Sequence, residues 1–155
     1  MRTIKIFAVL LVFSSVFFSC DKAQEAVNTY LNALSATVNG SAFTSTNTNA
    51  AKNPSNGATQ LTIDGTASNG QRITVAINNY TGANGTFAVG SGAGKAICAF
   101  NAGTSSDVIA TTGTVVITNI DNSQYTNGPV VSGTFSFTAG TYAVTNGNFS
   151  VFVAN

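Results

Sequence analysis

The feature that most constrains the fold of this chain is a period of two in the residues after Ser35. There, apolar and β-branched residues alternate with polar ones, and Asn-Gly and other glycine pairs separate the alternating runs. A period of two puts apolar side chains on one face of a β-strand, whereas an amphipathic helix needs a period near 3.6. No helical run follows Leu34. The pattern predicts an all-β domain, an antiparallel β-sandwich, with a flattened β-barrel as the alternative.

Individual strands and turns follow from the same pattern. Residues 36–44 predict a hairpin around Asn39-Gly40, because Asn-Gly supplies the positive φ angles of a type I′ turn. The polar stretches 45–59 and 102–112 are expected to be loops, and Asn146-Gly147 is expected to separate the last two strands. The other strand signals are Leu61–Asp64, Ile73–Ile77, Phe87–Val89, Ala96–Phe100, Val115–Ile117 and Val131–Thr138.

The first twenty residues have the layout of an export signal. Arg2 and Lys5 precede an uncharged apolar run over residues 6–18, and the small residue Ser19 comes next. As a helix, this run reaches about 20 Å, short of the roughly 30 Å core of a bilayer. The sequence therefore predicts a cleaved signal peptide over residues 1–19.

Cys20 makes this signal more specific. The run from Phe17 to Cys20 resembles the lipobox of bacterial lipoproteins, in which the Cys becomes the acylated first residue. The resemblance implies that Cys20 is lipidated and that the membrane is a partner through this lipid; an ordinary secretory signal is the alternative. Residues 20–34 are expected to be a tether with helical tendency, and residues 35–155 the β-sandwich domain. The expected location is the outer membrane, on its periplasmic or cell-surface face.

Composition excludes several classes of function. Only 7% of the residues are charged, the formal net charge is +1 and there is no His. Scattered basic residues cannot neutralise a nucleic-acid backbone, so no nucleic-acid partner is expected. Without His, and with Asp64, Asp107 and Asp121 as the only carboxylates of the domain, we expect no enzyme and no cofactor. Cys98 lies in an apolar run and is expected to be a buried, inert thiol.

Two weak candidate sites remain. Tyr80, Tyr125 and Tyr142 lie near asparagines and are candidates for glycan or partner contact, although tyrosines near turns are commonly rim residues with the hydroxyl in water. The run Asp121, Asn122, Ser123 is a weak candidate for calcium, because it offers oxygen ligands; an Asx-turn explains the same residues.

Taken together, the chain resembles a family of small uncharacterised lipoproteins from Bacteroidetes, an all-β domain of unknown function. The resemblance covers most of the mature domain, and Phe43 stands where a Trp is usual. It implies a fold and an envelope location, but no activity and no site residues. The residues that carry it are Val38, Asn39, Gly40 and Phe43; Leu61, Ile63 and Gly65; Ser132 to Ala139; and Thr145, Asn146, Gly147 and Phe149.

The functional hypothesis is a lipid-anchored cell-envelope β-sandwich that acts as a non-enzymatic binding or accessory module. Such a domain can dock proteins or glycans through loops, such as residues 45–59 and 101–113, that a rigid pair of sheets holds in place. The alternative is a self-assembling structural subunit, similar to those of surface layers or fimbriae, in which strand edges with few charges pair between copies. This alternative implies a homo-oligomer.

Overall fold

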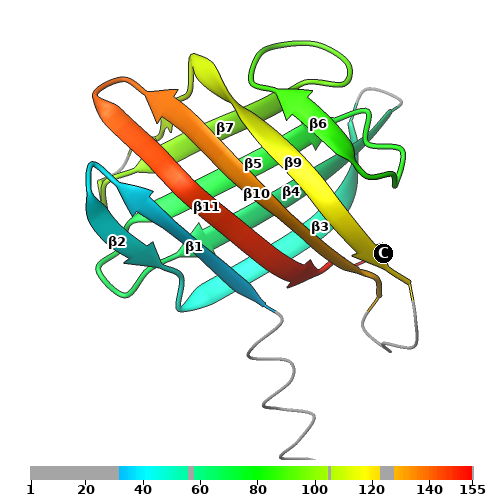
Figure 1. Cartoon of the computed structure of the whole chain (residues 1–155), viewed down its shortest axis with the longest axis horizontal. Helices are drawn as coiled ribbons and strands as arrows, with labels where there is room; N and C mark the ends of the chain where they lie inside the picture. The colour runs from blue at the N-terminus through cyan, green and yellow to red at the C-terminus, as the bar shows by residue number, and fades with distance from the viewer. Residues whose placement is uncertain (1–31, 56–57, 105, 123–127, 155) are drawn as a thin grey trace, which may run out of the picture. The chain divides into compact units, whose positions relative to one another are not determined.

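Two antiparallel β-sheets pack face to face in the computed structural model, which describes residues 32–55, 58–104, 106–122 and 128–154 (Figure 1). The predicted signal peptide, Cys20 and the predicted tether up to residue 31 lie outside these residues. The two sheets are separate and do not close on each other. The predicted β-sandwich is therefore confirmed, and the alternative of a flattened barrel was wrong.

The strands follow one another mostly as hairpins. The six-stranded sheet has the order β2 (Ser41–Thr44), β1 (Ala33–Val38), β11 (Tyr142–Phe152), β10 (Val130–Ala139), β9 (Thr112–Asp121) and β6 (Gly85–Ala88). The five-stranded sheet has the order β3 (Asn47–Ser55), β4 (Ala58–Thr66), β5 (Arg72–Asn78), β7 (Ala96–Asn101) and β8 (Val108–Ile109). Among the residues described, none forms a helix long and apolar enough to cross a membrane.

The hydrophobic core lies between the sheets and consists of the inward members of the alternating runs. In β4 and β5 every second side chain is fully buried. Most phenylalanines beyond the predicted signal fill the same space, because aromatic rings bury a large apolar area; Phe152 is buried outside this cluster. Those that are buried are Phe43, Phe100, Phe135, Phe137, Phe149 and Phe152, and Phe87 is half-buried against the core.

The predicted first hairpin is present. Asn39 and Gly40 connect β1 to β2 with φ angles of 47° and 83°, as a type I′ turn requires. β1 begins at Ala33, two residues before the expected start of the domain, and Leu34 is buried. The chain therefore enters the sandwich through a residue that belongs to the core.

The expected loop over residues 45–59 was wrong. Residues 47–55 form β3, which pairs with β4 along its whole length. The stretch looks polar because β3 is an edge strand: its register with β4 places Thr48, Ala50 and Lys52 on the inward face, and of these only Ala50 is apolar. Its low hydrophobicity reflects its place at the edge of the sheet, where Lys and Pro are tolerated. The expected loop over residues 102–112 also contains a short strand, β8.

One Asp-Gly pair and one Asn-Gly pair, typical turn sequences, lie inside strands. Asp64-Gly65 lies near the end of β4, where Asp64 accepts a hydrogen bond of 2.5 Å from the Thr74 hydroxyl on β5. A Cβ at Gly65 would be 3.1 Å from the side chain of Leu34 in the opposite sheet. The expectation that Asn146-Gly147 separates the last two strands was wrong, because this pair lies within the continuous strand β11. Glycine here serves close packing and not chain reversal.

Candidate functional site

Tyr80 and Tyr142, two of the three tyrosines proposed as candidates for glycan or partner contact, do not come together. Tyr80 is 4% exposed and its ring meets Phe87 edge-on, with ring centres 6.2 Å apart. Burial raises the pKa of Tyr80, and its hydroxyl has no hydrogen-bond partner within the described chain. Because this ring belongs to the core, Tyr80 offers no exposed aromatic face.

Tyr142 lies at the other end of the sandwich. Its half-buried ring packs on Phe100, with ring centres 4.7 Å apart, and Phe100 pairs with Ile73 at the start of β5, whereas Tyr80 follows the end of that strand. Tyr125 lies outside the described residues. Within the described chain, Tyr80 and Tyr142 therefore form no common platform.

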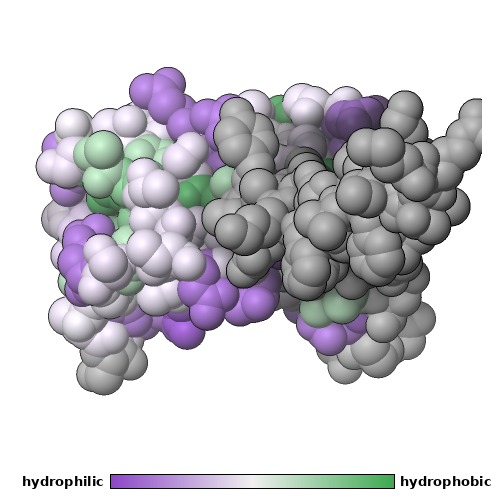
Figure 2. Space-filling view, turned by 90° about the horizontal axis from the view of Figure 1, so that it is seen from below, coloured by the Kyte–Doolittle hydropathy of each residue, from purple (hydrophilic) through white to green (hydrophobic). Residues whose placement is uncertain are grey.

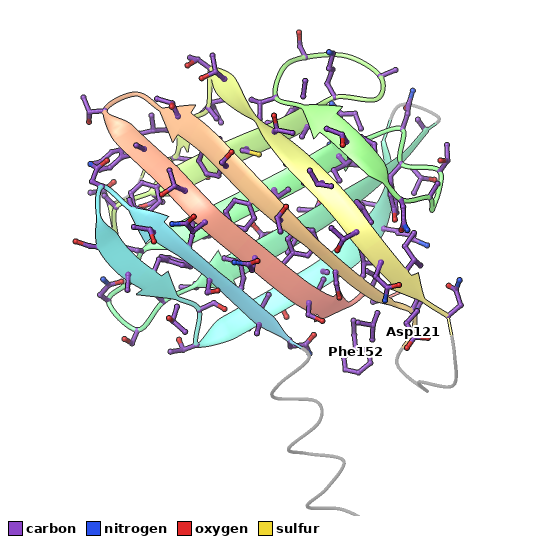
Figure 3. The ribbon with its side chains drawn as sticks, viewed as in Figure 1. Asp121 and Phe152 are labelled. Atoms are coloured by element: carbon purple, nitrogen blue, oxygen red, sulfur yellow. The ribbon has the colours of Figure 1, made fainter. Side chains whose placement is uncertain are left out.

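The calcium candidate is only partly described. Asp121 ends β9, Asn122 is exposed, and Ser123 lies outside the described residues. Figure 3 shows Asp121 and Phe152 at the same end of the sandwich, where Val130 pairs with both of them. No cluster of three or more His, Cys, Asp or Glu side chains suited to a metal occurs in the part of the chain that the structure describes.

A groove that sequence reasoning missed lies on the outer face of the six-stranded sheet. It has a volume of ≈ 480 Å³ and crosses β9, β10 and β11. We call it the bulge groove, because β11 is irregular where it forms one wall. Its lining residues are Thr114, Val116, Thr134, Phe135, Ser136, Asn146, Gly147 and Asn148.

The bulge itself is a double register shift in β11. Against β10, residues 145 and 146 lie opposite the single residue Ser136, and against β1, residues 146 and 147 lie opposite the single residue Ala36. Asn146 takes up the extra residue with a φ of 50°, a conformation that Asn tolerates better than most residues. Bulges next to binding sites redirect side chains.

Gly147 is required at this bulge for space. A Cβ at this position would be 2.5 Å from the ring of Phe135, a separation that real Cβ atoms do not show. The Phe135 ring in turn stacks between those of Phe137 and Phe149, at centre distances of 6.0 and 6.3 Å. The groove wall therefore rests on a packed row of three rings.

Most polar side chains of the bulge groove have no hydrogen-bond partner among the described residues. The side chains of Thr114, Thr134, Ser136 and Asn146 make no hydrogen bond to any described residue, and only the Asn148 amide is engaged, at 2.9 Å from the Asn146 carbonyl. None of the lining side chains titrates, and the methyl groups of Val116 add an apolar contact. The groove is therefore equipped to hydrogen-bond an uncharged polar ligand.

A second groove, on the five-stranded sheet, differs in this respect. It measures ≈ 390 Å³ and includes Gln60, Asn78, Gly92 and Ile97. The Gln60 amide donates to Asn78 Oδ1 at 2.7 Å, and the Asn78 amide donates to the Gly92 carbonyl at 3.3 Å. These amides hold the loop after β6 in place, so the bulge groove is the better candidate for binding.

The clearest electrostatic feature lies away from both grooves. Arg72 on β5 contacts Asp107 at 2.6 Å, and Asn101 donates to the same carboxylate at 2.9 Å. The Arg72 hydrogen bond lowers the pKa of Asp107, and the carboxylate raises the pKa of Arg72. Asn101 Oδ1 also accepts from the backbone of Gly103 and Thr104, so this network anchors the loop between β7 and β8.

The remaining thiol of the domain has no exposed face. Cys98 is fully buried, and desolvation raises its pKa to about 12. At neutral pH it stays protonated, and a protonated thiol is a poor nucleophile.

The surface between these features is poor in charge. Viewed from below, this surface is mostly hydrophilic or neutral, with a small hydrophobic area toward the left (Figure 2).

Part of the bulge groove could be predicted from the sequence, because the alternation over residues 131–138 placed Thr134 and Ser136 on a solvated face. The missing signal was Asn-Gly inside a continuous strand pattern, which marks a bulge.

Comparison with known proteins gives one match. A family model described as "Domain of unknown function (DUF6252)" matches residues 31–153, which include all eleven described strands. No curated protein and no solved structure matches the chain.

Proposed function

The chain belongs to the DUF6252 family of domains of unknown function, and from this premise we propose that it is a lipid-anchored, non-enzymatic binding module of the cell envelope. The anchor rests on the apolar leader and on Cys20, and an outer-membrane location follows from the same sequence features. The binding role rests on the bulge groove.

The observation that carries this function is the set of unpartnered polar groups over the bulge. Three hydroxyls and one amide are exposed or half-exposed on strands in the middle of a sheet, where the backbone is already hydrogen-bonded on both sides. A ligand must therefore be recognised by side chains and cannot join the sheet as an added strand. Pockets of about 300–1,000 Å³ with a few polar groups are the size class that holds small ligands.

The ligand that fits this chemistry is uncharged and rich in hydroxyl or amide groups. No lining side chain carries a charge that would compensate a phosphate, a carboxylate or an ammonium group. The same absence of titratable groups leaves the groove without an acid, a base or an activated nucleophile. Binding without chemical conversion is the role that this groove supports.

Thermal-shift and calorimetric titrations test the proposal on the full chain in detergent, with neutral oligosaccharides and uncharged peptides as probes. Thr134→Val and Asn146→Gly remove one hydroxyl and one amide from the groove, and we expect each to weaken binding at least about tenfold. Thr44→Val, which removes an exposed hydroxyl on the same sheet outside the groove, is the matched control. Absence of binding by every probe, or binding that ignores the groove variants, contradicts the proposal.

Self-assembly through strand edges is less well supported. The edge strands β2, β6 and β8 are short, with four, four and two residues. The long edge strand β3 contains Lys52 and Pro54, and its middle is bridged by Ala154. Short edges, Lys and Pro are the features by which proteins avoid edge-to-edge pairing.

A further inference from the structure

The outer face of the five-stranded sheet differs from that of the six-stranded sheet. The two large hydrophobic side chains that are exposed in the described chain, Ile97 and Ile109, both lie on it, with 36% and 58% of their surface accessible. Ile97 pairs with Ala76, and Ile109 pairs with Ala99. Neighbouring exposed hydrophobics on one sheet face mark an interaction surface more often than scattered single ones do.

The strand register arranges this face as a regular grid. Its rows run across the strands, and the two central rows contain the apolar residues. From one end to the other the rows are Asn53, Gln60, Asn78; Ala51, Thr62, Ala76, Ile97; Asn49, Asp64, Thr74, Ala99, Ile109; and Asn47, Thr66, Arg72, Asn101.

Charge is distributed unequally between the two ends of the grid. Lys95 directly precedes β7 and is exposed. It lies beside Asn78, whose backbone N–H donates to the Lys95 carbonyl at 3.0 Å. Asp64 lies two rows away on β4. At the far end Arg72 and Asp107 neutralise each other, so the net charges are one positive at the Lys95 end and one negative at the Asp64 end.

We infer that this face pairs with the same face of a second copy of the chain. A twofold axis through Ala76 and Ala99, diagonal to the strands, exchanges the places of Lys95 and Asp64, so that each lysine of a pair meets the aspartate of the other copy. Ala76 and Ala99 on the axis are 7% and 5% exposed, so no large side chain projects along it and the two faces can approach. In an isologous dimer every such contact occurs twice.

The size of the face predicts a weak dimer. The four rows hold four residues on average, so the face covers about 20 Å by 20 Å, or about 400 Å² for each copy. A total near 800 Å² belongs to the class of weak, transient interfaces. We therefore expect a dissociation constant of about 10–100 µM for the dimer. Tethering of both copies to one membrane would raise their effective concentration.

Sedimentation equilibrium of the full chain in density-matched detergent tests the inference with a charge exchange. Lys95→Asp and Asp64→Lys should each raise the dissociation constant about tenfold, and the double variant should return it to within about threefold of the wild type. Ile109→Thr should weaken the dimer about tenfold without any change of charge. Thermal midpoints of all variants show that each one is folded.

Two results overturn the dimer. One is a wild-type chain that stays monomeric up to about 1 mM at low salt. The other is a double variant that associates no better than either single variant. Because Asp64 also accepts a bond from Thr74, Asp64→Asn serves as a milder variant that keeps this bond and still removes the charge; it should weaken the dimer about threefold, and no change contradicts the charge pairing.

Discussion

Asn39 and Ala143 are separated by 104 residues in the chain and are joined by two hydrogen bonds. The backbone N–H of Asn39 donates to the Ala143 carbonyl at 2.9 Å, and the Ala143 N–H donates to Asn39 Oδ1 at 2.8 Å. The Asn39 amide also donates to the Thr141 carbonyl at 3.3 Å. One side chain therefore links the turn between β1 and β2 to the turn between β10 and β11.

This link predicts a large stability effect for an exposed turn residue. Asn39→Ala should lower the free energy of unfolding by about 2 kcal/mol, because it removes the side-chain bonds and places Ala in the left-handed region. Asn39→Gly keeps the backbone conformation and should cost about half as much. Both variants lose the side-chain bonds and only Ala is strained, so urea unfolding of the two separates the contributions. An Asn39→Gly variant as stable as the wild type would show that the Asn39 side-chain bonds are not stabilising.

Gly147 and Phe135 are coupled through space. Gly147→Ala should lower the free energy of unfolding by about 2–3 kcal/mol, because its Cβ would overlap the Phe135 ring. Combined with Phe135→Leu, the same change should cost clearly less than the sum of the two single changes. Gly85→Ala is the matched control, because Gly85 also lies in a strand without a positive φ and the nearest atom to a Cβ there would be 3.4 Å away. Additive effects in the double variant would contradict the proposed overlap.

The Arg72–Asp107 pair predicts a modest loss of stability in acid. The pKa of Asp107 is lowered in the folded protein, so its contribution is present above the pKa of the unfolded chain, near 3.9, and is lost as pH falls through the lower folded value. The pair is 43% and 34% exposed, and such pairs contribute about 0.5 kcal/mol. Asp107→Asn should therefore flatten the dependence of the unfolding free energy on pH between about pH 5 and 2. An unchanged slope would mean that other groups cause the loss of stability in acid.

Lipidation predicts that the two cysteines behave differently. In cells supplied with a labelled fatty acid, Cys20→Ala should abolish incorporation and leave the chain uncleaved, since the acylated Cys is the expected first residue of the mature protein. Cys98→Ala should leave labelling unchanged, because this thiol is buried inside the domain. Mass spectrometry of the mature N-terminus measures both outcomes. Labelling that survives Cys20→Ala would rule out this anchor.

Much of the fold follows from local pattern. Alternation over residues 61–64, 73–77 and 131–138 identified strands and their buried sides, because whether a side chain points inward depends only on its place in a period of two. The Asn39-Gly40 turn was also predicted from local sequence, because two adjacent residues determine its type. The polar edge strand β3 escaped detection, because few of its side chains contribute to the core.

The order of the strands and the binding surfaces depend on tertiary structure. No local sequence pattern predicts that β1 pairs with β11, that Tyr80 is buried, or that Asn146-Gly147 forms a bulge and not a turn. The bulge groove joins Thr114, Thr134 and Asn146 from three strands, and such a juxtaposition depends on strand register. The sequence by itself determined which residues form strands and face the core, because that choice is local; only the long-range pairing of those strands decided which exposed groups meet.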